Sequence, residues 1–495
     1  MIYQSTRSDS LTATPAQSVL EGIAPDGGLY SVKDLSGISF DWKEILTMDT
    51  RSMAVKILSA LLPSFSEEEM RIIVGEGYQD KFDAEDLTPT FSVGDDTVLE
   101  LFRGPTSAFK DVALSLLPRL MVASGHKCGS TDEILILTAT SGDTGKAAME
   151  GFRDVPGTRI IVFYPYGSVS AVQELQMTTQ EGKNVLACAV RGNFDDAQRG
   201  VKNIFGCESI EKELKENGIR LSSANSINIG RLAPQVVYYF KAYADLVRKG
   251  TVRVGGKVDF CVPTGNFGDI LAGYFAKELG LPVGKLICAS NANNVLTDFL
   301  RTGRFDSRRV FYRTESPSMD ILVPSNLERM LFMLSKDTAL VSRMMASLKS
   351  DGVYDVPESL FRQLSEIYWA GYCDDEGTEN AIGEVWKRFG YLMDTHTAVS
   401  WNVAQQYKKE NPDHAPVVIL STASPYKFPE AVLRAIGAPK GEDPFDDMIK
   451  LQEATGIKVP KNLSGLQKRS VRHQDVIECK DMAQYVTEMA LRRQW

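Results

Sequence analysis

The feature that most constrains the fold is a repeated alternation of short apolar runs with segments of helical periodicity. A turn that contains glycine, serine or aspartate separates most of these runs from the helical segment that follows. This alternation is typical of parallel strands joined by right-handed helical crossovers. It predicts an α/β fold whose strands form an early and a late set: 134–138, 160–165 and 185–190, then 258–265, 285–291 and 416–424.

The length of 495 residues is too great for one compact core and suggests roughly two to four domains. Helical spacing of apolar residues at 53–62, and a serine before three glutamates at 66–78, predict helices near the N-terminus. A strand is expected at 97–102 and mostly helix at 325–390. The expected organisation is a mainly helical region (1–95), an α/β domain (96–250), a second α/β domain (251–440) and a charged tail packed on the surface (441–495).

Charge and cysteine content disfavour several classes of function. The formal net charge of −9 argues against general nucleic-acid binding, although a local cationic pocket for a small anion stays compatible with it. The seven cysteines include no CxxC pair and are expected to be reduced thiols. The sequence has no HExxH zinc pattern, no signal-peptide pattern and no apolar run long enough to span a bilayer. We therefore expect a cytoplasmic protein with a small-molecule substrate and without metal, nucleic-acid or membrane partners.

One lysine, Lys110, lies in an unusual sequence setting, FRGPTSAFKD at 102–111. A Gly-Pro turn at 104–105 precedes two residues that favour helix N-caps, Thr106 and Ser107, and apolar residues then recur at helical spacing. Lys110 is therefore expected in the first turn of a half-buried helix, where burial and the helix dipole favour its neutral amine. Such a lysine can form an imine with a carbonyl cofactor. The alternative is a surface lysine paired with a neighbouring acid.

Two glycine-containing loops lie between a predicted strand and a predicted helix. In GNFGD at 265–269, backbone N–H groups at the start of the helix could cradle a phosphate, and a plain tight turn is the alternative. In SGDTG at 141–145, the hydroxyls of Ser141 and Thr144 could hold a carboxylate or a phosphate, and a helix cap is the alternative.

Neither loop matches a nucleotide-binding fingerprint. A P-loop needs glycine as its first residue and serine or threonine after its lysine, but Thr140 and Ala147 occupy these positions. The GxGxxG pattern does not follow any predicted strand. A phosphotransferase and a nicotinamide enzyme are both disfavoured for these reasons.

A lysine nucleophile, a phosphate cradle and a second anion loop together favour pyridoxal phosphate as the cofactor. The chain resembles the threonine synthase family, in the tryptophan-synthase-β-like group of pyridoxal phosphate enzymes (fold type II), and its length is similar to the fungal-type branch. This resemblance implies two open, mostly parallel sheet domains with helices on both faces. It runs from residue 1 to about 440 and is carried by 104–114, 138–145, 164–179, 225–232, 263–282, 319–329, 394–399 and 421–428.

The resemblance also implies roles for individual residues. Lys110 would bind the cofactor covalently and later move protons at Cα and Cγ of the substrate. Other cofactor contacts would come from Gly265, Asn266, Phe267, Gly268, Asp269 and Thr422, whose hydroxyl would face the pyridine nitrogen. The substrate carboxylate would meet Ser141, Gly142, Asp143 and Thr144, and the substrate phosphate would meet Asn225, Ser226, Asn228 and Arg231. Alternatives are a helix cap for Asp269 and a structural ion pair for Arg231.

The implied reaction is γ-elimination of phosphate from O-phospho-L-homoserine, followed by addition of water at Cβ to give L-threonine. A phospho-lyase of the same group, which releases 2-oxobutyrate and phosphate, is the alternative, and a monomer or small homo-oligomer is expected. The sequence departs from the family pattern at Arg103, Pro118, Ser424 and Tyr426. Arg103 adds a cation that could assist phosphate binding, and Pro118 should kink or end the helix that begins at Lys110.

Overall fold

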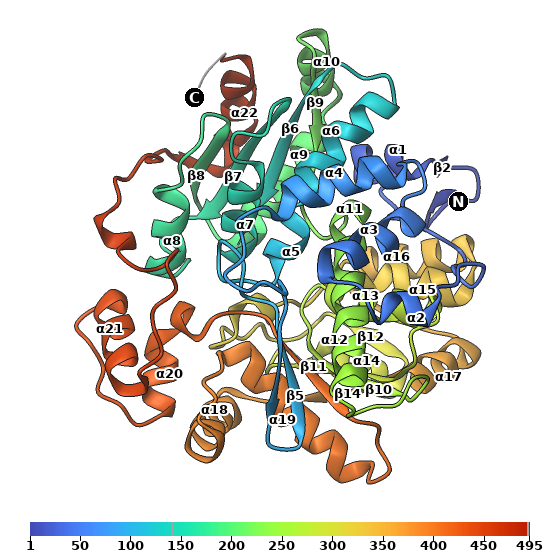
Figure 1. Cartoon of the computed structure of the whole chain (residues 1–495). Coiled ribbons are helices and arrows are strands. Elements are labelled where there is room, and N and C mark those ends of the chain that lie inside the picture. The colour runs from blue at the N-terminus through green and yellow to red at the C-terminus, as the bar shows by residue number, and fades with distance from the viewer. Residues whose placement is uncertain (141, 493–494) are drawn as a thin grey trace.

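The computed structural model describes residues 1–140, 142–492 and 495, and it contains two main sheets surrounded by helices (Figure 1). The smaller sheet contains, in order across it, β16 (Val476–Glu478), β8 (Val185–Arg191), β7 (Thr158–Pro165), β6 (Glu133–Ala139) and β9 (Ile219–Ser222). The larger contains β14 (Tyr368–Tyr372), β11 (Val283–Ser290), β10 (Val258–Pro263), β15 (Val417–Ser421), β5 (Asp96–Glu100) and β4 (Thr90–Val93). Among these strands only β4 pairs in antiparallel fashion. The predicted α/β class, with open and mostly parallel sheets, is confirmed.

Helices pack against both sheets. Those against the smaller sheet are α7 (Asp143–Phe152), α9 (Phe194–Phe205) and α10 (Glu208–Glu216). Those against the larger sheet are α13 (Gly268–Glu278), α14 (Val295–Thr302), α17 (Glu358–Ile367) and α19 (Thr395–Glu410). A largely buried helix, α12 (Val236–Arg248), packs against α13 and against α3 (Thr50–Leu61) of the N-terminal region, and it joins that region to the larger sheet.

The N-terminal region combines helices with a small sheet. Its helix α4 (Glu67–Tyr78) begins at Ser66, whose side chain forms the expected capping box with Glu69. The region also contains β1 (Tyr3–Ser5), β2 (Thr12–Ala13), β3 (Tyr30–Ser31), α1 (Pro15–Glu21) and α2 (Trp42–Ile45). The antiparallel order β2-β1-β3 was not expected, because strands this short carry little periodicity.

The strand expected at 97–102 belongs to the later set of strands. It is β5, which pairs in parallel with β15, so that Thr97 lies opposite Val418. The expectation that it starts the 96–250 domain is therefore wrong for this strand. The chain then crosses to the smaller sheet through α5 (Lys110–Leu114) and α6 (Leu117–Lys127), where α5 packs against α7. As predicted, the helix that begins at Lys110 ends before Pro118, which lies in the first turn of α6, where a missing N–H is tolerated.

Residues 325–390 are mostly helical, as predicted, but they also contain strands. The helices are α15 (Leu327–Ser335), α16 (Thr338–Asp351), α17 and α18 (Asp375–Phe389). The strands are β13 (Val353–Asp355), which pairs with β12 (Arg304–Asp306), and β14 at the edge of the larger sheet.

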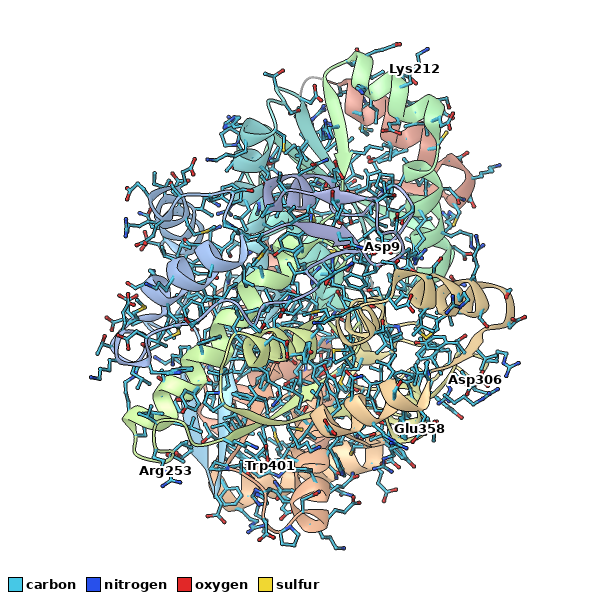
Figure 2. All side chains as sticks on the ribbon, turned by 90° about the vertical axis from the view of Figure 1, so that its right-hand side faces the viewer. Asp9, Lys212, Arg253, Asp306, Glu358 and Trp401 are labelled. Carbon is cyan, nitrogen blue, oxygen red and sulfur yellow. The ribbon has the colours of Figure 1, made fainter. Side chains whose placement is uncertain are left out.

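The C-terminal residues are integrated into the fold. After α20 (Pro429–Ala435) and α21 (Pro444–Thr455), the chain adds β16 beside β8, and α22 (Met482–Leu491) packs against α9 and α10. Figure 2 shows side chains filling the space between the elements, with charged residues such as Lys212 and Arg253 at the periphery. Within the described residues, no helix combines the length and the apolar character needed to cross a membrane.

Candidate active site

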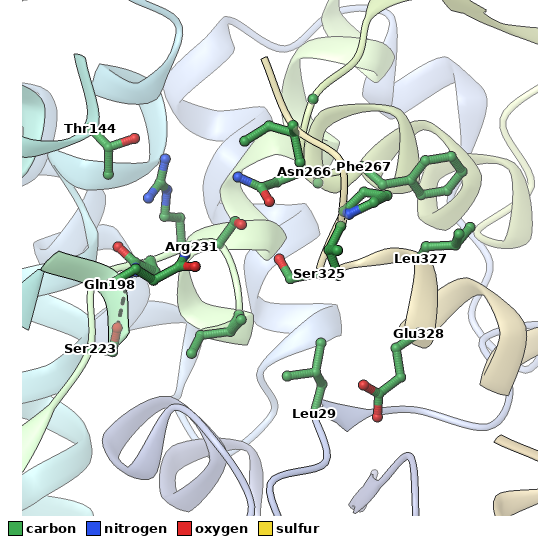
Figure 3. A pocket seen from close by; sticks show the side chains of 18 of the residues that line it. Leu29, Thr144, Gln198, Ser223, Arg231, Asn266, Phe267, Ser325, Leu327 and Glu328 are labelled. Carbon is green, nitrogen blue, oxygen red and sulfur yellow. Dashed lines mark hydrogen bonds between the residues drawn. The ribbon is translucent and has the colours of Figure 1, made fainter. Parts of the chain in front are cut away.

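A cavity of about 750 Å³ lies at the carboxyl ends of β6, β10 and β15. In open α/β sheets, ligands bind in the crevice outside these strand ends. Figure 3 shows Thr144 and Gln198 on the side of the smaller sheet and Asn266 and Glu328 on the opposite side. The cavity is therefore bounded by elements from both sheets.

Lys110 is the first residue of α5 and lines this cavity. Its side chain is largely buried, and its Nζ lies 3.9 Å from Oδ2 of Asp143 and 4.7 Å from the centre of the Phe109 ring. Burial lowers the pKa of Lys110 from 10.5 to about 8, although the Asp143 carboxylate acts in the opposite direction. The structure thus excludes the alternative of a surface lysine and places a readily deprotonated amine in the cavity wall.

Helix α5 begins without a side-chain cap, and Phe109 occupies the N-cap position. The expectation that Thr106 or Ser107 caps the helix is therefore wrong. Thr106 instead donates from its hydroxyl and its N–H to the carboxylate of Asp111, at 2.5 and 2.8 Å. A Cβ atom at Gly104 would lie 2.5 Å from Cβ of Asp111, so the turn before Lys110 requires glycine.

The loop before Lys110 is joined directly to the segment that follows β15. The N–H of Phe109 donates to the carbonyl of Thr422 at 2.8 Å, and the N–H of Ser424 donates to the carbonyl of Ser107 at 3.1 Å. These bonds fix the position of Thr422, which also lines the cavity, relative to Lys110. Ser424 makes its contact through the backbone, so its difference from the family pattern leaves this link intact.

The loop from Gly265 to Gly268 connects β10 to the start of α13. Phe267 adopts a left-handed conformation with φ of 62°, and the N–H groups of Asn266, Phe267 and Gly268 have no acceptor among the described residues. A Cβ atom at Gly265 would lie 2.7 Å from the carbonyl oxygen of Ser318. Free N–H groups at a helix start next to a left-handed residue form an anion-binding concavity.

Asp269 lies in the first turn of α13 but does not cap it, which corrects the expected alternative. Its Oδ1 accepts hydrogen bonds from the hydroxyls of Tyr238 and Tyr239, the latter at 3.1 Å. Its Oδ2 is buried without a partner among the described residues. Burial raises the pKa of Asp269 to about 6, against the effect of the two tyrosine hydroxyls, so that its carboxylate is protonated more readily than an exposed one.

The carboxylate of Asp143 is contacted by three side chains that lie far apart in the sequence. Lys427 donates to its Oδ1, Gln173 donates to the same oxygen at 2.9 Å, and Lys110 lies near Oδ2. Burial acts to raise the pKa of Asp143, but the ammonium groups of Lys427 and Lys110 hold it well below its usual range. An ionised side chain would repel a substrate carboxylate, so the expected binding role cannot belong to the side chain of Asp143.

The rest of the SGDTG loop offers backbone donors. The N–H groups of Asp143 and Thr144 have no acceptor among the described residues, and Thr144 lines the cavity. The N–H of Gly142 instead donates to the hydroxyl of Thr140 at 2.9 Å, and Gly142 is not part of the cavity wall. Ser141 lies outside the described residues.

Arg231 places a buried guanidinium in the cavity wall (Figure 3). It donates to the carbonyl of Ala224 at 2.8 Å, and no carboxylate among the described residues pairs with it. Burial lowers the pKa of Arg231 to about 10, which leaves it charged at neutral pH. The alternative of a structural ion pair is therefore not supported, and a buried cation without a counter-ion is suited to an anionic ligand.

The neighbouring residues 225–228, of sequence NSIN, divide into two parts. Asn225 and Ser226 line the cavity beside Arg231. Asn228 does not: its amide donates to the carbonyls of Val19 and Ser223, and its Oδ1 caps α11 (Ile229–Leu232). This geometry corrects the expected substrate contact of Asn228, because its side chain is fully committed to the fold.

Arg103 also does not reach the cavity. Its guanidinium pairs with Glu100 at 2.5 Å and lies 3.7 Å from Asp83. The expectation that Arg103 assists phosphate binding is therefore not supported, because two carboxylates neutralise it.

Two functional candidates were missed in the sequence. His396 lines the cavity, with Nδ1 2.7 Å from Asp394 and Nε2 accepting the N–H of Ser318 at 3.1 Å. Lys427 has a fully buried side chain and reaches the cavity only through Asp143. Both residues lie in stretches that match the family, 394–399 and 421–428, but neither spacing nor periodicity separates them from core residues.

The cavity fits the cofactor that the resemblance implies. It brings together a deprotonatable lysine, the unoccupied N–H donors of residues 266–268 and the hydroxyl of Thr422. The close approach of Gly265 to Ser318 shows that this loop has no space for a larger side chain. Pyridoxal phosphate needs such a lysine, such a phosphate cradle and a partner for its pyridine nitrogen.

Comparison with known proteins gives the same result. Three family models match: "Threonine synthase N terminus" at residues 2–78, "Pyridoxal-phosphate dependent enzyme" at 98–423 and "Threonine synthase, C-terminal" at 397–486. Threonine synthase from Pseudomonas aeruginosa is 37% identical over 475 residues, which cover 94% of this chain and 97% of that protein. Human threonine synthase-like 1 is 38% identical over 434 residues, which cover 85% of this chain but only 58% of the human protein.

A solved structure extends the similarity to three dimensions. The crystal structure of threonine synthase with bound pyridoxal phosphate from Brucella melitensis superimposes with a TM-score of 0.86 at 35% identity, and it covers 99% of this chain and 100% of that one. The match includes the N-terminal region and the C-terminal segment as well as the two sheets. The chain therefore belongs to the threonine synthase family of pyridoxal-phosphate-dependent enzymes.

Proposed function

We propose that this protein is a threonine synthase that converts O-phospho-L-homoserine and water into L-threonine and phosphate. The observation that carries the proposal is Arg231, a buried guanidinium without a carboxylate partner among the described residues, in the same cavity as Lys110. A substrate with a terminal phosphate would supply the missing counter-ion for Arg231. The length of that substrate would fix the distance between this phosphate and the substrate amino group, which would replace Lys110 on the cofactor.

Under this proposal, the cofactor is bound by the residues at the carboxyl ends of β10 and β15. Lys110 binds it covalently, residues 265–268 hold its phosphate through their N–H groups, and the hydroxyl of Thr422 meets its pyridine nitrogen. Because that hydroxyl is neutral, it does not force the nitrogen to stay protonated. When bound, pyridoxal phosphate supplies an electron-accepting ring that makes the substrate protons at Cα and Cβ acidic.

The substrate is held at both ends. Arg231, Asn225 and Ser226 bind its phosphate, and the N–H groups of Asp143 and Thr144 bind its carboxylate. Forked hydrogen bonds from a guanidinium orient a phosphate dianion as well as neutralise it. This orientation places the bond from Cγ to the phosphate oxygen within the cavity that also contains Lys110.

Proton transfer then falls to Lys110. Its lowered pKa of about 8 allows the amine to accept a proton from Cα and return one to Cγ near neutral pH. The carboxylate of Asp143, 3.9 Å away, stabilises the ammonium form after each acceptance. In the balanced reaction, Cβ loses a proton and phosphate leaves Cγ, and the hydroxyl of one water molecule then adds at Cβ. Of the two protons set free from Cβ and from water, one is gained by Cγ and the other by the departing phosphate.

Product analysis tests the proposal. Purified protein supplied with pyridoxal phosphate and O-phospho-L-homoserine should release threonine and phosphate in equal amounts. Lys110→Ala should abolish both products and the visible absorbance of the bound cofactor, whereas the exposed Lys212→Ala should change neither. Phosphate with 2-oxobutyrate in place of threonine would identify a phospho-lyase, and release of neither product would refute the proposal.

A further inference from the structure

The side chain of Asn462, in the C-terminal segment, reaches the loop that carries Lys110. Its Nδ2 donates to the carbonyl of Pro105 at 2.8 Å. The hydroxyl of Ser107 lies 3.0 Å from Oδ1 and 2.9 Å from Nδ2 of the same amide. The amide thus bridges two residues that precede Lys110 by five and three positions, across a sequence separation of more than 350 residues.

Ser107 needs such a partner because of its backbone. It is buried and adopts a left-handed conformation with φ of 58°, which disfavours every residue type except glycine and, to a smaller extent, asparagine and aspartate. A strained residue of this kind persists where surrounding contacts determine its conformation, and such residues concentrate at active sites. The bond between Ser424 N–H and the Ser107 carbonyl holds the backbone, and Asn462 holds the side chain.

The segment around Asn462 is itself firmly anchored. Leu463 and Leu466 are buried in the same apolar cluster as Tyr426, and the Tyr426 hydroxyl donates to the carbonyl of Ile457. Tyr426 is one of the positions that differ from the family pattern, and its hydroxyl fixes the tail a few residues before Asn462. The contact with the lysine loop is therefore part of a packed structure on both sides of Asn462.

We propose that Asn462 is a positioning residue that fixes residues 105–107 and thereby the direction in which Lys110 enters the cavity. This inference rests on the proposed function, since it assigns the role through Lys110. Asn462 is not among the residues that line the cavity, so its role is assigned through the loop that it contacts. Its effect should appear in catalytic rate and cofactor orientation, because small displacements of a reacting group reduce rate far more than they reduce binding.

The test compares Asn462→Ala with Gln452→Ala in the full-length holoenzyme. Gln452 accepts the N–H of Val459 at 3.0 Å and so loses a tail contact that does not involve the lysine loop. Asn462→Ala should lower kcat about tenfold or more with little change in KM and should weaken the visible circular dichroism of the bound cofactor. Gln452→Ala should change neither. Asn462→Asp, which keeps the shape but loses the donor to Pro105, should show a defect in the same direction even if the alanine variant folds poorly.

A double-mutant cycle with Ser107→Gly separates positioning from general stability. Glycine adopts the left-handed conformation without strain, so part of what Asn462 supplies is no longer needed. The fold-loss in kcat caused by Asn462→Ala should therefore be smaller in the Ser107→Gly background. Independent effects of the two substitutions, or kcat and circular dichroism of Asn462→Ala equal to those of Gln452→Ala, would overturn the inference. A wild-type protein without a visible cofactor band would instead overturn the proposed function.

Discussion

The protonation state of Lys110 determines when the cavity can capture an aldehyde. Its Nζ faces the carboxylate of Asp143, while the cations Arg231 and Lys427 act from other sides, and burial lowers its pKa from 10.5 to about 8. Only the neutral amine is nucleophilic, so we predict that capture of pyridoxal phosphate by the cofactor-free protein accelerates as pH rises, with a midpoint near pH 8. Stopped-flow absorbance measures this rate. A midpoint near that of free lysine would contradict the prediction.

Lys427 should influence this midpoint without entering the cavity. Its ammonium shares the Asp143 carboxylate with Lys110 and so reduces the stabilisation that Asp143 gives to the protonated form of Lys110. We predict that Lys427→Met moves the midpoint of cofactor capture to higher pH, by about one pH unit. Lys212→Met, at an exposed site, serves as the matched control. A midpoint unchanged in Lys427→Met would show that Asp143 does not couple the two lysines.

Arg231 should show opposite effects on activity and on stability. Its burial without a carboxylate partner disfavours the folded protein in the absence of substrate. We predict that Arg231→Met retains or raises the thermal midpoint of the substrate-free protein but lowers kcat/KM about 100-fold, because a buried charge pair with the substrate phosphate is lost. Calorimetry and steady-state kinetics measure the two quantities. A large loss of stability in Arg231→Met would contradict the prediction and indicate that Arg231 serves the fold, for example through its bond to the Ala224 carbonyl.

Local sequence patterns predict some residues of the site and miss others. Lys110 and residues 265–268 were predicted, because turn chemistry and a glycine loop at a strand end carry local signals. Two contacts could not be predicted from the sequence: the hydrogen bond from Asn228 to Val19 and the ion pair of Arg103 with Glu100. Each partner is brought into reach by the folding of the chain and not by a local pattern. Lys427 and Asn462 were missed for the same reason. Their contact partners, Asp143 and Ser107, lie far away in the sequence, and no local pattern identifies them.

Among the elements, the turn between β10 and α13 is the most restrictive. A Cβ atom at Gly265 would meet the carbonyl oxygen of Ser318 at 2.7 Å, so Gly265→Ala must displace backbone at the cofactor phosphate. We predict that the dissociation constant for pyridoxal phosphate rises about tenfold or more, since overpacking costs about 1–3 kcal/mol. Fluorescence titration of the cofactor-free protein measures it.

Gly75→Ala is the matched control for Gly265→Ala. Gly75 lies inside helix α4, and a Cβ atom there would meet no neighbour within 4 Å. The substitution should therefore stabilise the protein by about 1 kcal/mol through helix propensity and leave cofactor affinity unchanged. An equal loss of affinity in both variants would show that the effect of Gly265→Ala is not local.

Sheet membership was the least predictable property of the elements. The periodicity that identified β5 as a strand says nothing of its neighbour, and its partner β15 follows more than 300 residues later. As a result, β5 belongs to the larger sheet while α5 packs against α7 beside the smaller one. The segment from β5 to α5 thus passes from the larger sheet to the smaller one and places Lys110 between them, in the wall of the cavity.

The final segment of the chain completes the smaller sheet of the molecule. Met482 of α22 is buried in the cluster formed by α9 and the strands of that sheet, and its sulfur lies over Gly200 of α9, where an added Cβ would approach it within 2.3 Å. We predict that Met482→Ala lowers the free energy of unfolding of this part of the protein by about 2–5 kcal/mol, as expected for a fully packed core side chain. Chemical denaturation followed by circular dichroism measures the loss, and Lys480→Ala, outside the cluster, is the control. If both variants unfold like the wild type, α22 is only a surface attachment to the smaller sheet and not part of its core.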